Sequence, residues 1–493
     1  MQYGRHRVLE AIPALLVWTT FAVAIILSFA APIWAIGFII VFDLYWMYRV
    51  LYFIVFVLHA WARFRRSERT DWMARLHQDA PAWGDRYWHL VFLPTYKEPV
   101  DIIDATLRQI TKGTYPCGRI IILLGGEERD RERFEANAEL MRKKYDHVFG
   151  LFFVTVHPNN LPDEIPGKGS NLNYMGHWAQ GELDRLGVAY EDVIASSLDV
   201  DTVVHPQYFA HLTHAYATAP NPTRASYQPV VVFNNNIWES PAPVRISAFG
   251  TTFWLLGELA RPNRLWTFSS HSMPFKMLVD VDFWEKDMVS EDSRIFLQGV
   301  RRYLGDYRVE PLYLPVSMDA VAGGSYWGSL KALYKQQRRW AWGVEHFPYI
   351  VEHIWRDRRI AFRKRLRLVW NHIEGMYTWA TAPILIFVMG WLPLKMAEGS
   401  TTALAYNAPF TLEWIMRVAA VGILASGAVS FSLLPRRPER VKPWTWLVLI
   451  LQWALLPITF ILFGAFPAID AQTRMALGRY LGFNVTEKSR ERF

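Results

Sequence analysis

The 493-residue chain contains one cysteine, Cys117, and neither an internal repeat nor a low-complexity linker. A single thiol excludes an intramolecular disulfide, so nothing in the sequence indicates an oxidising compartment, and we interpret Cys117 as a small buried thiol. From about Tyr87 to about Glu345 the chain also lacks any apolar run long enough to cross a bilayer. This stretch is therefore expected to fold as a domain in water, flanked by segments of another kind.

The composition divides between polar and apolar residues. Charged residues make up 20% of the chain, whereas apolar residues make up 52% and aromatic residues 15%. This balance indicates a water-soluble part joined to a lipid-soluble part. The net charge is +8, because arginine and lysine outnumber aspartate and glutamate. The basic residues gather beside apolar segments at 63–69, 356–367 and 436–442. Basic clusters in such places are suited to anionic lipid headgroups, so we expect the lipid bilayer as a partner and no nucleic acid.

Two apolar runs near the N-terminus, 11–30 and 33–58, are each long enough to cross a bilayer. A hydrocarbon core of about 30 Å needs about 20 helical residues. A cleaved signal peptide is the alternative for the first run, but that run is long and a second follows directly after Pro32. Arg5 and Arg7 precede the pair, and several arginines follow it. By the positive-inside rule both ends of this hairpin lie in the cytosol, which predicts an integral plasma (inner) membrane protein with a cytosolic domain.

The stretch 87–345 alternates short apolar runs with helix-like segments. Its expected strands are 89–93, 119–124, 150–156 and 193–198, which are largely apolar, as in strands covered on both faces. Helical stretches between them predict βαβ units, and hence an α/β domain with a largely parallel sheet. In such a domain, ligands bind at the carboxyl ends of the strands.

The C-terminal third is expected to return to the membrane. Residues 346–372 mix aromatic with basic side chains at helical spacing, which is typical of a helix lying flat at the membrane surface. Three apolar runs follow, at 375–395, 414–434 and 443–466. We therefore divide the chain into a transmembrane hairpin (1–58), a juxtamembrane linker (59–86), the α/β domain (87–345), an interface helix (346–374), transmembrane and interfacial helices (375–466) and a cytosolic tail (467–493).

Two polar motifs stand where expected strands end. The first is Pro94-Thr95-Tyr96-Lys97-Glu98-Pro99, at a place where an α/β domain holds a nucleotide base or ribose, although proline-rich strand ends are also ordinary turns. The second is Asp199-Val200-Asp201. Two carboxylates at a strand end are suited to a hard cation such as Mg²⁺ or Mn²⁺ beside a diphosphate, and a solvated turn is the alternative.

Two further motifs belong to expected helices. Ser290-Glu291-Asp292 places Ser290 as the cap of a helix that begins near Ser293. The helix dipole would keep a carboxylate there ionised and able to accept a proton from a sugar hydroxyl, and plain helix capping is the alternative. Gln336-Gln337-Arg338-Arg339-Trp340 supplies cationic forks for a diphosphate and an aromatic platform for a sugar ring. Ordinary helical charge and a core tryptophan would explain the same residues.

In combination these motifs closely resemble those of the membrane-integrated family 2 glycosyltransferases, the group that contains cellulose, hyaluronan and chitin synthases. The resemblance covers nearly the whole chain. LPTYKEP (93–99) is similar to the family's P-T-Y-N-E, GKGSNLN (167–173) to its K-A-G-N-L-N, LDVDT (198–202) to its D-x-D, SED (290–292) to its T-E-D, and QQRRW (336–340) to its Q-x-x-R-W. FNVTEK (483–488) resembles the F-x-V-T-x-K gating loop of cellulose synthases, with a disordered polar tail as the alternative.

The resemblance implies a GT-A-type (Rossmann-like) catalytic domain inserted between transmembrane helices. It also implies an inverting, processive, metal-dependent hexosyltransferase that polymerises a UDP-sugar, with UDP-glucose favoured, and exports a β-linked polysaccharide. The implied catalytic residues are Asp292 as general base, Asp201, Arg339, Trp340 and Gln336, and the implied metal ligands are Asp199 and Asp201. The implied nucleotide-sugar site comprises Thr95, Tyr96, Glu98, Glu127, Lys168, Asp199 and Thr486.

The sequence departs from the family at two places. Where the family has Asp-Asp-Gly after strand two, this chain has LGGEE (124–128), so Glu127 or Glu128 is expected to replace the aspartate that contacts the nucleobase. Where cellulose synthases have F-x-C-G-S, this chain has FSSHS (268–272). Ser270 and His271 are therefore expected at the acceptor beside Trp340, with the acceptor and the linkage left open. The tract FNNNIW (233–238) is suited to sugar contact, and a turn between strands is an equal alternative.

A gating loop must face the cytosol, which conflicts with three spanning segments after the domain. Following the resemblance, we expect 443–466, which contains Pro457, to lie at the interface or to re-enter the membrane, although the run is apolar enough to span. Asp43, with Tyr45 and Trp46, is expected either to line an export channel or to be satisfied between helices. Two other functions stay open: transfer of one sugar to a lipid acceptor, and a catalytically inactive channel or scaffold.

Overall fold

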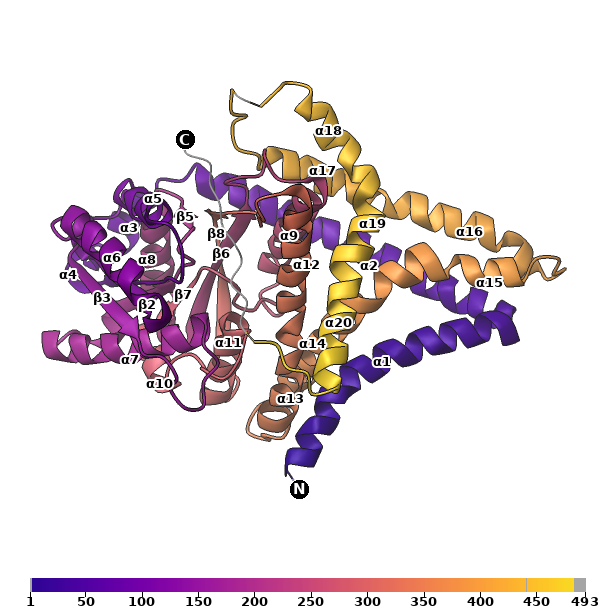
Figure 1. The fold of residues 1–493 in the computed structure, drawn as a ribbon, viewed down its shortest axis with the longest axis horizontal. Helices are drawn as coiled ribbons and strands as arrows, with labels where there is room; N and C mark the ends of the chain where they lie inside the picture. The colour runs from indigo at the N-terminus through magenta and orange to yellow at the C-terminus, as the bar shows by residue number, and fades with distance from the viewer. Residues whose placement is uncertain (1, 440, 483–493) are drawn as a thin grey trace.

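The computed structural model describes residues 2–439 and 441–482, and it places an α/β domain beside a group of long helices (Figure 1). Helix α1 (Gln2–Ala30) and helix α2 (Pro32–Glu68) are separated by Ala31 alone. Pro32 is the first residue of α2, where the missing N–H costs nothing because the first turn has no acceptor for it. Both predicted N-terminal apolar runs lie inside these two helices.

Within the described residues, five helical stretches have the length and apolar composition of membrane spans: Gly4–Ala30, Pro32–Glu68, Phe362–Met396, Ala403–Ser432 and Thr445–Ala476. The third joins α14 (Phe362–Ile384), the π-helical turn η7 (Leu385–Met389) and α15 (Trp391–Met396). The fourth joins α16 (Ala403–Ala419) and α17 (Val421–Ser432). The five apolar runs found in the sequence coincide with these stretches, so the chain has helices suited to integration into a membrane.

The domain is built on one sheet, whose eight described strands run in the order β3-β2-β1-β4-β7-β6-β8-β5. Their bounds are β1 (Trp88–Pro94), β2 (Ile120–Glu127), β3 (Leu151–His157), β4 (Val193–Ser197), β5 (Val203–Val204), β6 (Ala225–Phe233), β7 (His271–Pro274) and β8 (Arg308–Met318). The four strands expected from the sequence are β1 to β4, and their positions are confirmed. They are parallel to one another.

The rest of the sheet is mixed, so the expectation of a largely parallel sheet is correct only for this first half. Strand β7 runs antiparallel to β4 and to β6, and β5 runs antiparallel to β8. An antiparallel strand enters the sheet at the edge where its neighbour leaves it. Accordingly His271, the first residue of β7, pairs with Ser197, the last residue of β4. The start of β7 therefore lies at the carboxyl edge of the parallel strands, where a ligand is expected.

Ten α-helices lie between Trp72 and Ala341 in the described chain. They are α3 (Trp72–Asp79), α4 (Trp83–Arg86), α5 (Val100–Thr111), α6 (Arg131–Tyr145), α7 (Lys168–Leu186), α8 (Tyr208–Thr218), α9 (Ala242–Leu259), α10 (Phe275–Asp280), α11 (Glu291–Arg302) and α12 (Tyr326–Ala341). All eight residues of β2 are buried. A Cβ at Gly125 would lie 2.3 Å from Met175 Sδ, and one at Gly126 would lie 2.2 Å from the Phe134 ring. The two glycines of LGGEE are therefore needed because α7 and α6 press on this strand.

Residues 346–372 do not form the single helix expected from their periodicity. Helix α13 (His346–Tyr349) and the π-helical η6 (Ile350–Trp355) end at Trp355, and α14 begins only at Phe362. Asp357 makes the intervening turn, because its Oδ1 accepts a hydrogen bond from Arg359 N at 3.1 Å. The first half is also buried against the domain through Ile350 and Ile354. The single helix expected here is therefore wrong, and its position at a membrane surface stays a prediction.

The last long helical stretch lies along the domain. It comprises α18 (Thr445–Leu451), η8 (Gln452–Leu455), α19 (Leu456–Phe460), η9 (Ile461–Ala465) and α20 (Phe466–Ala476). Arg245 Nε of α9 donates to Gln452 Oε1 at 2.7 Å, and Arg338 Nη1 of α12 donates to Asp470 Oδ2 at 2.8 Å. In Figure 1 this stretch stands between the domain and helices α1, α15 and α16. These contacts tie the stretch to the domain, while its length and apolar composition are those of a span, so the interfacial placement expected for 443–466 stays a prediction.

Candidate active site

Lys168, the first residue of α7, joins the two acidic motifs. Its ammonium nitrogen lies 2.7 Å from Asp199 Oδ1 and donates to both carboxylate oxygens of Asp292, at 3.0 and 3.1 Å. Glu291 Oε1 is 4.0 Å away. Burial lowers the pKa of Lys168, but the three carboxylates outweigh burial and hold that pKa well above its usual value. Lys168 is therefore a fixed positive charge around which the Asp-x-Asp and Ser-Glu-Asp motifs meet.

The segment that leads into β7 lies against both aspartates. Ser269 Oγ donates to Asp199 Oδ2 at 2.6 Å, and His271 Nδ1 is 3.8 Å from Asp292 Oδ1. The same ring nitrogen lies 2.7 Å from the carbonyl oxygen of Phe268, which makes it the donor. Burial lowers the pKa of His271, while Asp292 opposes that shift only in part. The imidazole is therefore neutral near pH 7.

The two residues predicted to meet the acceptor, Ser270 and His271, are fully buried. Ser270 has a left-handed backbone conformation (φ 62°), and its Oγ lies 2.9 Å from Thr202 Oγ1. Ser269 was not singled out by the sequence, yet it is only partly buried and contacts Asp199 directly. The acceptor role of Ser270 and His271 stays a prediction, and Ser269 is the residue of this tract placed nearest to the acidic motifs.

Glu291 is a buried carboxyl group beside the candidate base. Its side chain is 4% exposed. Burial raises the pKa of Glu291 to about 8, and the negative charge of Asp292 adds to this effect. The positive charges of Lys168 and Arg339 act in the opposite direction, which places Arg339 within electrostatic reach of the motif. A large part of the Glu291 population is consequently protonated at neutral pH.

We expect Glu291→Gln to flatten the pH dependence of stability. Between the ordinary pKa of glutamate and a folded-state pKa of about 8, the folded protein holds a proton that the unfolded chain releases, so stability falls as pH rises across this interval. Glutamine does not titrate, and this part of the loss disappears. Unfolding temperatures at pH 5, 7 and 9 should therefore show the variant gaining several degrees on the parent as pH rises. Parallel curves, or the same gain in the control Glu310→Gln on β8, would contradict the assignment.

Asp201, the second aspartate of Asp-x-Asp, is 1% exposed and is held by two other segments of the same chain. Its Oδ2 accepts from Asp319 N at 3.3 Å, and its carbonyl oxygen accepts from Asn235 Nδ2 at 3.3 Å. Asn235 also donates to Asp319 Oδ1 at 2.9 Å, while Asn236 exchanges hydrogen bonds with Ala320 N and O. The asparagines of FNNNIW thus fix backbone turns, which favours the turn over sugar contact.

Asp199 and Asp201 provide hard oxygen donors of the kind that Mg²⁺ and Mn²⁺ prefer. Among the described residues, no three His, Cys, Asp or Glu side chains converge as a complete metal cage. This set still fits Mg²⁺, which is commonly held by one or two carboxylates and completed by substrate phosphates and water. The donor set is therefore adequate for a cation that binds together with a diphosphate.

Helix α12 carries the predicted Gln-x-x-Arg-Trp motif. Gln336 and Trp340, one turn apart, line a small cavity of about 10 Å³ together with Phe233 and Ser247. The rings of Trp340 and Phe233 are 5.7 Å apart. Gln337 donates to Ser247 Oγ at 3.0 Å, so it serves the packing of α12 on α9. The helix therefore presents Gln336 and Trp340 beside Phe233, the last residue of β6.

The predicted nucleotide residues stand at the ends of β1 and β2. Thr95 N and Oγ1 both donate to the carbonyl oxygen of Gly125, at 2.7 and 3.2 Å, and Tyr96 N donates to Glu98 Oε2 at 2.5 Å. The Arg129 guanidinium lies 4.6 Å from the centre of the Tyr96 ring. Thr95 and Glu98 thus fix this turn, and nucleotide contact by all three residues stays a prediction. Thr486 and the FNVTEK motif lie outside the described residues.

Glu127 belongs to a largely buried group of charged side chains that no local pattern predicts. Its Oε2 lies 3.3 Å from His157 Nδ1 and 3.3 Å from Arg129 Nη2. His157 Nε2 is in turn 3.2 Å from Glu164 Oε1. Arg129 follows Glu127 by two residues, whereas His157 ends β3 and Glu164 lies in the connection after it, so only the folded sheet brings these two to Glu127. Glu127 is thus firmly held at the edge where a nucleobase is expected, and its contact with the base stays a prediction.

Ser290 occupies the N-cap position of α11, as expected, but its side chain does not cap the helix. Helix α11 begins at Glu291 rather than near Ser293, and Ser290 makes no side-chain capping hydrogen bond. Its Oγ instead donates to Glu345 Oε1 at 2.7 Å. In a cap the hydroxyl oxygen would accept a hydrogen bond from a backbone N–H, whereas here the hydroxyl donates its proton to a carboxylate. Glu345 was not predicted, since nothing local in the sequence pairs it with Ser290.

The membrane helices contain the residues predicted for an export path. Tyr45 OH donates to Glu374 Oε1 at 3.2 Å, and Glu374 also pairs with Arg49 and, at 3.2 Å, with Arg264. Tyr45 is thus satisfied between helices. Asp43 is 4% exposed, and its Oδ1 has no hydrogen-bond partner among the described residues. A role for Asp43 or Trp46 in lining a channel stays a prediction.

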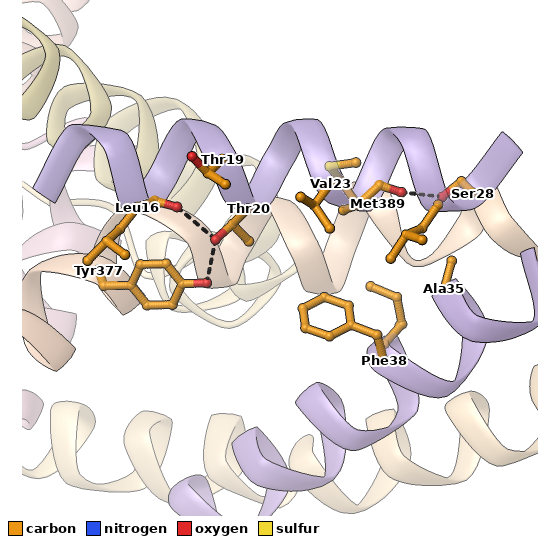
Figure 2. A pocket seen from close by; sticks show the side chains of 12 residues that line it. Leu16, Thr19, Thr20, Val23, Ser28, Ala35, Phe38, Tyr377 and Met389 are labelled. Atoms are coloured by element: carbon orange, nitrogen blue, oxygen red, sulfur yellow. Dashed lines mark hydrogen bonds between the residues drawn. The ribbon is translucent and has the colours of Figure 1, made fainter. Parts of the chain in front are cut away.

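A cavity of about 240 Å³ lies between α1, α2 and the α14–η7 helix (Figure 2). Its polar end is formed by Thr20 and Tyr377, whose hydroxyl oxygens are 2.9 Å apart. The remaining wall is mostly aliphatic and aromatic, and includes Val23, Phe38 and Met389. A sugar polymer would lose hydrogen bonds to water here without replacement, so this cavity is suited to hydrocarbon rather than to a polysaccharide.

No protein-family model matches the chain, and no curated protein matches it. Among solved structures, it is similar to a mannosyltransferase from Pyrobaculum calidifontis in complex with GDP-Man and Mn²⁺, at 14% identity and a TM-score of 0.43, over 83% of this chain and 97% of that one. It is also similar to residues 1–349 of TarS from S. aureus in complex with UDP-GlcNAc, at 11% identity and a TM-score of 0.37, over 80% of this chain and 94% of that one. Because these TM-scores are below 0.5, the function is inferred from the site itself.

Proposed function

We propose that this protein is a membrane-bound, inverting glycosyltransferase that transfers a hexose from a nucleotide sugar. The observation that carries the proposal is the Lys168 ammonium, which touches Asp199 at 2.7 Å and Asp292 at 3.0 Å. A candidate diphosphate-metal motif and a candidate base are thereby held on two sides of one cation. Arg339, Trp340 and Gln336 lie together on helix α12, and the Arg339 charge reaches Glu291, the neighbour of Asp292. These are the groups that a sugar, its leaving diphosphate and an acceptor hydroxyl require.

Asp292 is proposed as the general base. The acceptor hydroxyl gives its proton to an Asp292 oxygen while its own oxygen attacks the anomeric carbon, and the bond from that carbon to the diphosphate breaks. The bonding electrons leave with the nucleoside diphosphate, and Asp292 later releases the proton to water. One displacement inverts the anomeric carbon and gives a β linkage from an α-linked donor. Lys168 has to withdraw from Asp292 for this step, and the diphosphate is its natural alternative partner.

Mg²⁺ or Mn²⁺ would be held by Asp199 and Asp201. When bound, such a cation acts as a Lewis acid that neutralises charge on the departing diphosphate. The chain contributes further positive charge to the same place through Lys168 and Arg339. Thr95, Tyr96, Glu98 and Glu127 are proposed to hold the nucleoside, and Trp340 with Gln336 to receive the acceptor sugar. UDP is the proposed nucleotide.

The favoured activity is processive synthesis and export of a β-linked polysaccharide from UDP-glucose. The five spanning-length helices support attachment of the site to a membrane, and the sequence motifs support the processive group. Transfer of one sugar to a lipid acceptor is a second candidate, favoured by the apolar cavity between α1, α2 and α14. An inactive channel or scaffold is disfavoured, because it has no need for charged groups clustered as Lys168, Asp199 and Asp292 are.

A donor screen on the purified full chain tests the proposal. The protein is incubated with UDP-glucose, UDP-N-acetylglucosamine, UDP-galactose or GDP-mannose, with Mg²⁺ or Mn²⁺, and nucleoside diphosphate release is measured together with product length and linkage. We expect release from UDP-glucose and a long β-linked product. A short, lipid-extractable product would support the second candidate. If no donor yields free nucleoside diphosphate, the proposed transferase activity is rejected.

A further inference from the structure

Glu345 ends the short 3₁₀ segment η5 (Trp342–Glu345) that follows α12. Its Oε1 accepts hydrogen bonds from Ser290 Oγ at 2.7 Å, Ser290 N at 3.0 Å and Val289 N at 3.4 Å. Its Oε2 accepts from Trp342 Nε1 at 3.0 Å. Hydrogen bonds to a carboxylate are stronger than those between neutral groups. One side chain therefore ties the residue before the Glu291–Asp292 pair to the end of the helix that carries Arg339 and Trp340.

The next residue, His346, contacts the beginning of α11 through Ser293 and Arg294. Arg294 Nε donates to His346 Nδ1 at 3.2 Å, so the ring proton is on Nε2, which lies 2.7 Å from Ser293 Oγ. Burial lowers the pKa of His346 well below its usual value, and the nearby Arg294 charge lowers it further, which is consistent with this neutral tautomer. Ser290 and Ser293 flank Glu291 and Asp292 in the chain. The first turn of α11 is thus fixed on both sides of the candidate base.

None of these contacts includes Asp292 itself, whose carboxylate is bound by Lys168. The effect on Asp292 is therefore indirect and passes through the backbone of residues 289–293. A catalytic group displaced by about 1 Å can lose about 100-fold in rate, so a bond that fixes this backbone has kinetic consequences. The link also sets the distance between α11, with the base, and α12, with Trp340.

We propose that Glu345 is a positioning residue that holds Asp292 in register with the Arg339–Trp340 end of α12 through Ser290 and Trp342. The proposal rests on the proposed transferase function. It adds to that function a residue outside the motifs, which touches neither substrate nor metal ligand and acts through the helix that it anchors.

The test uses Glu345→Gln in the full-length protein. Glutamine keeps the size of the side chain but turns one acceptor oxygen into an N–H₂ donor, which then faces either Ser290 and Val289 or the Trp342 indole, all of them donors. We expect kcat to fall by about 10- to 100-fold, while KM for the sugar nucleotide and the dissociation constant for UDP stay within about threefold. The matched control is Glu352→Gln, which alters a contact of 3.0 Å with His6 and should leave kcat unchanged.

A double-mutant cycle separates positioning from general weakening of the fold. If Glu345 acts through the Ser290 hydroxyl, Ser290→Ala lowers kcat in the parent but has little further effect in Glu345→Gln. Additive losses overturn the proposal, as does an unchanged kcat in Glu345→Gln. If Glu345→Gln does not fold, Ser290→Ala alone decides, and an unchanged kcat then overturns it. If the parent protein releases nucleoside diphosphate and Glu345→Gln does so at the same rate, only the positioning role is rejected. If the parent protein is inactive on every donor, the transferase function itself is rejected.

Discussion

Replacing Asp292 by asparagine is expected to reduce kcat by about 100- to 10,000-fold, the range attributed to a general base. Asparagine preserves the size of the side chain but cannot accept the proton of the acceptor hydroxyl. Nucleotide binding should change little, because Asp199 still holds Lys168 at 2.7 Å on the other side of the site. Nucleoside diphosphate release measures the first effect, and calorimetry with UDP and Mn²⁺ measures the second.

The matched control for Asp292→Asn is Asp287→Asn. It removes an exposed carboxylate five positions earlier, in the connection that leads into α11. It changes the net charge equally but has no proposed part in proton transfer. Comparable unfolding temperatures of the two variants would show that the fold is intact. A variant Asp292→Asn that polymerises at the parental rate would remove Asp292 from the mechanism and return Ser-Glu-Asp to a purely structural role.

The sequence predicts one edge of the sheet well because two strong signals coincide there. Strands β1, β2 and β4 are almost entirely buried, so their sequences are largely apolar, and a polar residue follows within two positions of each strand end. Parallel strands bring these carboxyl ends to one edge, which places Asp199 near Thr95 and Glu127 without any knowledge of side-chain contacts. Lys168, Asp199 and Asp292 belong to three motifs on which the resemblance depends, and the structure brings these three side chains into contact.

The second half of the sheet could not be predicted in the same way. Strand β7 has only four residues, and β5 has two, which is too short for periodicity to identify. The contact of Ser269 with Asp199 depends on the antiparallel entry of β7, a fact of topology rather than of local sequence. The break at Asp357 was hidden for another reason, since aromatic and basic residues continue with helical spacing on both sides of a turn made by side-chain hydrogen bonds.

The sequence did not predict the residues that hold the site residues in place, because their polar contacts join positions far apart in the chain. Glu345 holds Ser290, and His157 holds Glu127, across separations at which no pattern in a single sequence pairs two residues. Each pairing satisfies a carboxylate that burial would otherwise penalise by several kcal/mol. The motifs therefore supplied the candidates for the reacting groups, whereas the residues that hold those candidates in place became visible only in the folded chain.

Replacing Asp201 by asparagine is expected to abolish the metal-dependent part of nucleotide binding. Asp201 is 1% exposed, and its Oδ2 accepts a hydrogen bond from Asp319 N at 3.3 Å. Asparagine keeps a carbonyl oxygen for that bond, so the turn survives, but it removes the negative charge that a divalent cation needs. Loss of a group that only hydrogen-bonds to a metal ligand costs about 10- to 100-fold in metal affinity, so loss of a direct ligand should cost at least about 100-fold. Calorimetric titration with UDP, with and without Mn²⁺, measures the difference.

The control for this experiment lies at the opposite end of the same strand. Asp192, just before β4, forms an ion pair of 2.6 Å with Arg86, so Asp192→Asn removes a carboxylate at the edge away from the site. That variant should retain the full gain in UDP affinity on adding Mn²⁺, whereas Asp201→Asn should bind UDP equally with and without the cation. If Asp201→Asn keeps the gain, the cation is held elsewhere. Asp-x-Asp would then be a buried turn clamped by Asn235 and Asp319, and the metal-assisted departure of the diphosphate would lose its structural basis.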